Sequence, residues 1–207
     1  MTAHWRFIFG CCTDRIATLG PETNARLTAL TGAALLVLLA VEGVTLLSLR
    51  AMLSWHIFVG VLVIPVVALK LGSTGYRFFR YYTRRPEYVR AGPPHPLLRL
   101  LGPVVILATV VLLATGIALI LVGPGAGLVL TLHKASFVVW LGALGAHVLG
   151  HLGRLRAVGA DLGSGDRLGE SRWRLLLVAG AVVAGAVAAV VVLPHGAPWV
   201  HWMRVEH

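Results

Sequence analysis

Two histidines, His56 and His133, each stand close to the start of a long apolar segment of the chain. A histidine inside a hydrocarbon span is costly and normally faces the interior of a helix bundle. If these segments are the second and fourth spans of a membrane protein, they run in the same direction and both rings lie at one depth. Neutral imidazoles on facing helices can then bind one metal from opposite sides, as the two axial ligands of a haem iron do.

The elements that must position these rings are apolar helices. The chain has 207 residues, of which 57% are hydrophobic, and a mean hydropathy of +0.84. Crossing roughly 30 Å of hydrocarbon takes about 20 helical residues, and only helices or closed barrels satisfy their backbone polar groups there. We predict an all-α membrane protein with five transmembrane helices, near residues 28–50, 54–71, 99–122, 130–152 and 173–194.

The spacing of the spans suggests two hairpins and one additional helix. Gly43 in span one and Gly116 in span three are each followed, 13 and 17 residues later, by the histidine that opens the next span. We therefore predict a four-helix haem-binding bundle plus one extra helix. The expected organisation is an N-terminal segment over 1–27, the bundle over 28–153, a loop over 154–172, and a fifth helix with an outer tail over 173–207.

The formal net charge of +10 follows the predicted topology, which argues against nucleic acid as the partner. Fifteen of the 18 lysines and arginines precede span one or lie in, or at the edges of, the two loops after spans two and four. The longer of these polar loops covers 73–96. The positive-inside rule then predicts an inner (plasma) membrane protein with a cytoplasmic N-terminus and an outer C-terminus. The basic loops can also contact anionic lipid headgroups.

Several smaller features lie near the two histidines. Gly43, Gly116 and Gly60 could let a flat macrocycle approach the helices, or could serve ordinary helix packing. Lys134, beside His133, is placed to meet a haem propionate or a lipid phosphate.

Glu42 is the only acid deep in a predicted span, at about the depth of His56. Intramembrane carboxylates are functional candidates by default. Two interpretations stay open for it. Glu42 is either a proton acceptor from quinol or a protonated group that is hydrogen-bonded to a neighbouring helix.

Span four carries two further histidines. His147 follows His133 by 14 residues and His151 follows it by 18, so both return to nearly the same helix face. Fourteen residues rise about 21 Å along a helix, a plausible separation for two haems stacked across a membrane.

This pattern resembles the di-haem membrane cytochromes b, which include the membrane subunits of formate dehydrogenases and hydrogenases and the cytochrome b of quinol-oxidising complexes. The resemblance rests on His56, His133 and His147, on Thr115-Gly116, and on the spans over 28–153. It implies haem b as the cofactor, bound near each face, and electron transfer between quinone and a partner protein.

The chain departs from this family where the inner haem would need its second ligand. Lys70 stands 14 residues after His56, where quinol-oxidising cytochromes b have a histidine, and span one has none. His147 or His151 pairs with His95, or Lys70 is a ligand, or the inner haem is absent and one outer haem remains. We favour the last interpretation, with Lys70 extending its charge towards the membrane surface.

Two other classes of function remain open. One is a non-redox membrane protein, such as an assembly factor or small transporter, whose histidines are structural or bind a metal ion. A zinc site would need three or four converging ligands, for which His195 could join the pair. The other is a ferric reductase-like enzyme that uses an outer haem to reduce an external metal ion.

Overall fold

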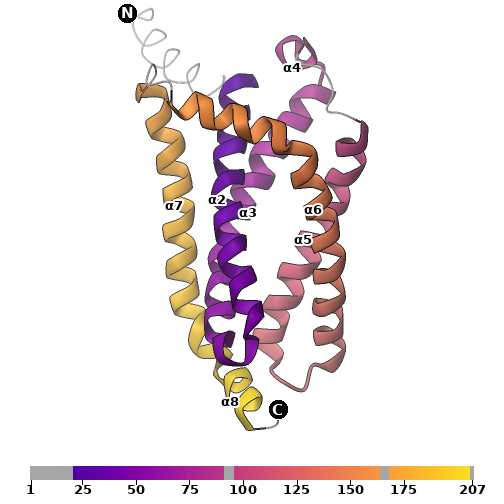
Figure 1. Ribbon diagram of the computed structural model, residues 1–207, viewed down its shortest axis with the longest axis vertical. Helices are drawn as coiled ribbons and strands as arrows, with labels where there is room; N and C mark the ends of the chain where they lie inside the picture. Colours follow the sequence, from indigo (N-terminus) through magenta and orange to yellow (C-terminus); the bar gives the residue numbers. More distant parts are fainter. Residues whose placement is uncertain (1–20, 91–95, 164–167, 206–207) are drawn as a thin grey trace, which may run out of the picture.

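The protein consists almost entirely of helices in a computed structural model that describes residues 21–90, 96–163 and 168–205 (Figure 1). Side chains are described over 21–90, 100–150 and 172–205. The helices are α2 (Pro21–Leu47), α3 (Leu49–Tyr82), α4 (Pro86–Arg90), α5 (Pro96–Val122), α6 (Gly127–Gly163), α7 (Leu168–Val192), the 3-10 turn η1 (Leu193–Gly196) and α8 (Ala197–Val205). Five described segments are long and apolar enough to cross a membrane, which confirms the predicted fold class.

Proline and glycine set several helix boundaries. Pro21 and Pro96 begin α2 and α5, where a missing N–H costs nothing. Gly123 ends α5 with φ at 79°, a left-handed conformation that glycine adopts without strain, and its N–H bonds to the Leu119 carbonyl at 3.0 Å. Pro124 follows, and the turn into α6 is short.

Two helices continue well beyond the apolar spans that the sequence predicts. α3 runs to Tyr82, so the first part of the predicted polar loop over 73–96 is helical. α6 runs to Gly163, so the first half of the connecting segment over 154–172 is helical. Hydropathy marks only the part of a helix that sits in hydrocarbon, whereas the backbone hydrogen bonds of a helix persist in the polar region beyond it.

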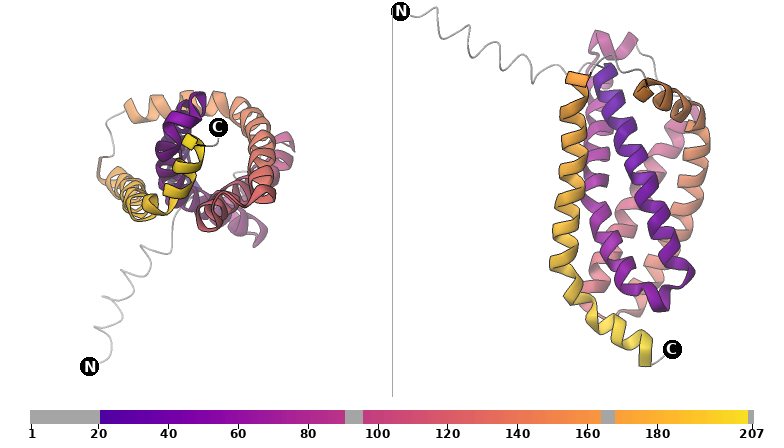
Figure 2. Two further views of the ribbon diagram at one scale, coloured as in Figure 1. Left: turned by 90° about the horizontal axis from the view of Figure 1, so that it is seen from below. Right: turned by 60° about the vertical axis from the view of Figure 1, so that its left-hand side comes forward.

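The long helices form two hairpins with α7 added on one side. α2 packs along α3, α5 packs along α6, and α7 lies against α3 through a cluster of Val61, Leu62 and Ala189. The two views in Figure 2 show the hairpins side by side, with α7 at the outer edge of the first. Contacts between the two hairpins are sparse, so a small number of side chains determines their relative position.

A few buried hydrogen bonds tie the helices to one another. Asn24 of α2 donates to the Ser73 carbonyl of α3 at 3.0 Å, and Trp140 of α6 donates to the Thr109 hydroxyl of α5 at 3.0 Å. Trp199 of α8 donates to the Leu119 carbonyl of α5 at 2.6 Å, which folds the C-terminal helix beneath the bundle. Such bonds replace water as partners for polar groups in an apolar environment.

Candidate functional site

His56 lies two turns into α3 and is held from α2. Its Nδ1 is 2.8 Å from Oε1 of Glu42 and 3.2 Å from the Thr45 hydroxyl. Both partners lie on one face of α2, because residues three apart on a helix are neighbours. The side chains of His56 and Glu42 are 23% and 17% exposed. The second carboxylate oxygen of Glu42 is buried and has no hydrogen-bond partner within the described residues.

His133 of α6 is held in the same manner from α5. Its Nδ1 is 3.1 Å from the Thr115 hydroxyl and 3.2 Å from the Leu112 carbonyl. The ring lies directly on Gly116, where an added Cβ would come within 3.3 Å of Cε1. Gly116 therefore allows the ring to seat closely against the backbone of α5.

These hydrogen bonds assign the tautomer of both histidines. The hydroxyl of Thr45 donates its single proton to the Glu42 carbonyl at 2.6 Å, and that of Thr115 donates to the Val111 carbonyl at 2.7 Å. Each hydroxyl can therefore only accept from the neighbouring imidazole. In the neutral form of both rings, Nδ1 therefore carries the proton and Nε2 has a lone pair that is able to bind a metal.

The two rings meet across the gap between the hairpins. Their centroids are 6.4 Å apart and their planes are inclined by 82°. Metal–imidazole bonds are about 2 Å long and a ring nitrogen lies about 1.2 Å from its centroid, so a metal held linearly between two imidazoles separates their centroids by about 6.3 Å. The spacing equals that of a bis-imidazole metal site, and it also lies within the range of rings in direct contact.

The donor set fits an iron porphyrin better than a free zinc ion. In the part of the chain that the structure describes, no three histidine, cysteine, aspartate or glutamate side chains converge on one point. His195 does not join His56 and His133 in a cluster of that kind. A zinc site would want three or four such ligands, whereas a haem iron needs only two axial ones because the porphyrin supplies four nitrogens.

Of the remaining residues predicted for this site, some lie close to the histidines and Glu42 and others do not. Gly60 lies beside Glu42, since a Cβ there would be 3.5 Å from Oε1 of the carboxylate. Gly43 is exposed and has nothing within 4 Å of an added Cβ. Lys134 is exposed, next to His133 but on the surface of α6. The structure thus brings Gly60 and Gly116 to the site and leaves Gly43 and Lys134 at its edge.

His147 lies towards the opposite end of the bundle, further along α6 than His133. The side chain of His147 is partly buried. Lys70 donates a hydrogen bond to the Thr28 carbonyl of α2, and its Nζ lies 3.0 Å from where a Cβ on Gly32 would be. The side chain of His151, and all of His95, lie outside the described residues.

Sequence reasoning missed the residues that orient the two rings. Thr45 and the Leu112 carbonyl were not singled out, and Thr115 was noted only as the neighbour of Gly116. Threonine is common in membrane helices, so its type alone carries little signal. The three-residue spacing of Glu42 and Thr45, both on one face of α2, is the pattern that could have indicated their shared partner.

Comparisons of the chain with protein-family models, with curated proteins and with solved structures give no match.

Proposed function

We propose that this chain is an integral membrane b-type cytochrome that binds one haem b between His56 and His133. It would pass electrons between a quinol or a reductase and a partner redox protein. The observation that carries the proposal is the symmetric clamp on the two imidazoles. Both rings present Nε2 as a lone pair, both have Nδ1 hydrogen-bonded to a neighbouring helix, and their 6.4 Å separation suits one metal between them.

The protein's own contribution is to hold and tune the two ligands. A bound haem supplies the one-electron chemistry, and the protein sets the ligands, burial and nearby charge. Glu42 places a carboxylate against His56, whereas His133 bonds to a neutral carbonyl and a hydroxyl. A hydrogen bond to a carboxylate makes an imidazole the stronger electron donor, so the two ligands differ in donor strength.

Glu42 is also the candidate proton acceptor. Its Oε1 accepts from His56, while its Oε2 is buried and has no hydrogen-bond partner within the described residues. An acceptor left without a partner in an apolar environment is costly, and that cost favours a group that receives a proton or a substrate hydroxyl. This role in quinol oxidation belongs to the proposal.

One haem rather than two is favoured by the arrangement at the opposite end of the bundle. Lys70 occupies the position that would supply the second inner ligand, and its amine is already bonded to the Thr28 carbonyl. An amine ligates iron only when it is deprotonated, whereas lysine is ordinarily an ammonium without a free lone pair. We infer that His147 and His151 do not complete a second haem site.

The test is a reduced-minus-oxidised absorbance spectrum of the purified full-length protein. We expect a haem b band with one haem per chain. His56→Ala and His133→Ala should each abolish the band, while the exposed His201, changed to alanine, serves as a control and should retain it.

A band of full strength in either ligand variant would assign the ligands elsewhere. Absence of a band in the unaltered protein would favour the non-redox function, with the two rings in direct contact as structural elements. Two haems per chain would reinstate an inner site at His147.

A further inference from the structure

The end of α3 and the short helix α4 form a basic, aromatic corner, defined here as residues 76–90. It contains five arginines and one glutamate. Phe78 and Phe79 are 63% and 65% exposed although α3 is continuous with a membrane-spanning segment. Exposed phenylalanines beside arginines at a helix end are typical of a surface that lies among lipid headgroups.

The corner has a defined structure because α4 packs against α3. Tyr88 of α4 is 2% exposed and packs edge-on against Tyr76 of α3, with ring centroids 6.2 Å apart. The Arg80 guanidinium lies 5.6 Å from the Tyr76 ring and 5.9 Å from the Tyr88 ring, and it contacts Glu87 at 3.7 Å. Arg80 is therefore engaged in holding the corner together.

Arg84, by contrast, is held in a strained backbone conformation. Its φ is 56°, the left-handed region in which glycine is the usual residue at the end of a helix. The reversal is closed by backbone bonds from Arg84 N–H to the Tyr81 carbonyl at 3.0 Å and from Arg85 N–H to the Arg80 carbonyl at 3.2 Å. An arginine at a position that suits glycine makes its side chain a candidate for a function.

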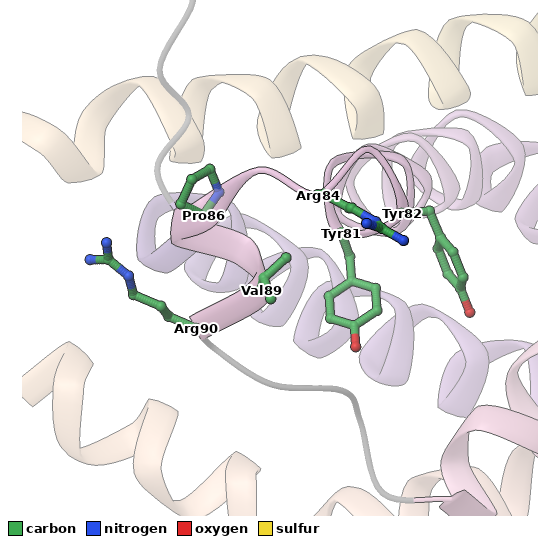
Figure 3. Close-up of a pocket in the computed structure, with 6 residues that line it drawn as sticks. All are labelled: Tyr81, Tyr82, Arg84, Pro86, Val89 and Arg90. Atoms are coloured by element: carbon green, nitrogen blue, oxygen red, sulfur yellow. The ribbon is translucent and has the colours of Figure 1, made fainter.

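The Arg84 side chain reaches into an open hollow of about 520 Å³ on the surface of the corner. The hollow is lined by Tyr81, Tyr82, Arg84, Pro86, Val89 and Arg90. Figure 3 shows Arg84 extending between Tyr81 and Tyr82, with Arg90 on the other side of Val89. Within the described residues, neither Arg84 nor Arg90 has a carboxylate within ion-pair distance.

We propose that this hollow binds the phosphate headgroup of an anionic phospholipid. Arg84 and the Tyr81 hydroxyl offer a charged and a neutral donor to phosphate oxygens, and Pro86 and Val89 offer an apolar wall to the glycerol backbone. The excess of arginine over glutamate complements a negatively charged headgroup. This proposal is independent of the haem, because it uses none of the residues near His56 and His133.

The lipid, rather than a soluble phosphate compound, is the ligand that the surroundings favour. Phe78 and Phe79 expose their rings on the same stretch of α3, just below the hollow in the direction of the membrane span. A soluble anion would gain nothing from these rings, whereas acyl chains can cover them.

The experiment uses the full-length protein in detergent, titrated with short-chain phosphatidylglycerol, with phosphatidylcholine of the same chain length, and with inorganic phosphate. Thermal stability and the binding curve are both measured. We expect phosphatidylglycerol to bind at least tenfold more tightly than phosphatidylcholine. Inorganic phosphate at equal concentration should not displace it.

The decisive variant is Arg84→Gly, because it removes the guanidinium and relieves the left-handed strain together. Its Tm without lipid should rise while its preference for phosphatidylglycerol falls about tenfold. Arg84→Lys should restore part of the preference, since lysine keeps the charge. Arg85→Gln, which removes one exposed charge outside the hollow, is the matched control and should retain binding.

Three results would overturn the proposal. Equal binding of the two lipids would show that charge plays no part. An equal loss of lipid preference in Arg84→Gly and Arg85→Gln would show that the net charge of the corner attracts the lipid and that no defined site binds it. Displacement of phosphatidylglycerol by inorganic phosphate would assign the hollow to a soluble anion.

Discussion

At the scale of single residues, His133 and His56 differ in how closely the glycine of the neighbouring helix approaches the imidazole ring. The His133 ring lies on Gly116, with 3.3 Å between Cε1 and a Cβ added there, whereas Gly43 has open space around it. Both glycines belong to the same sequence pattern, yet only one is sterically required. The pair therefore provides a matched test of the site.

Gly116→Ala should displace the His133 ring by a few tenths of an ångström and weaken its bond to Thr115 or Leu112. A hydrogen bond is worth about 1 kcal/mol, so haem retention should fall about fivefold. Gly43→Ala should leave retention unchanged. Haem content per chain, measured after extended dialysis, checks both. Equal retention in the two variants would contradict the close seating of the ring.

Glu42→Gln should raise the midpoint potential of a haem bound at this site. The carboxylate stabilises the positive charge that oxidation adds near His56, from which it lies 2.8 Å away, and glutamine keeps the shape without the charge. We expect a rise of tens of millivolts, given that about 59 mV corresponds to 1.4 kcal/mol for one electron. Potentiometric titration measures it, and a fall in potential would contradict the role given to Glu42.

At the scale of the helices, the contact between α3 and α7 depends on one small residue. A Cβ added to Gly185 of α7 would overlap the carbonyl group of Leu62, so the two backbones approach as closely as glycine permits. Close approach of backbones is a main source of helix association in membranes, where lipid and protein are equally apolar.

Gly185→Ala should therefore force α7 away from α3 and destabilise the protein by about 1–3 kcal/mol. Gly180→Ala, on the same helix with nothing within 4 Å, should have no effect or a small stabilising one, because alanine is the better helix former. The apparent Tm in detergent distinguishes the two, and equal values would show that α7 does not pack as described.

The helices also show which parts of the fold were predictable. Hydropathy predicted five spans and placed both histidines near one end of the bundle, and the structure brings their rings to 6.4 Å. α3 and α6 both continue past the predicted spans, because the basic residues that end an apolar run do not end a helix. The contact between Glu42 and His56 depends on how α2 packs against α3. The spacing of residues along either helix alone does not reveal that packing.

At the scale of the whole molecule, two hairpins with sparse mutual contacts are joined near one end by the imidazole pair. The arginines of the α3–α4 corner lie at the opposite end. That separation of charge and histidines underlies the expected orientation, with the basic end in the cytoplasm.

Reporter fusions test this orientation. A reporter enzyme that is active only outside the cytoplasm should be active when fused after His207. The same reporter should be inactive when fused after Arg90. The reversed pattern would place the histidines near the cytoplasmic face and would overturn the charge argument.

The inclination of the two imidazole planes has a spectroscopic consequence. If these rings bind a haem iron as proposed, each planar ring would donate π-electrons mainly into one of two iron d orbitals, and rings inclined by 82° would act on both orbitals almost equally. Near-degenerate orbitals retain orbital angular momentum. A ferric centre held in this geometry would give a highly anisotropic low-spin paramagnetic resonance signal, whereas parallel rings would give a rhombic one.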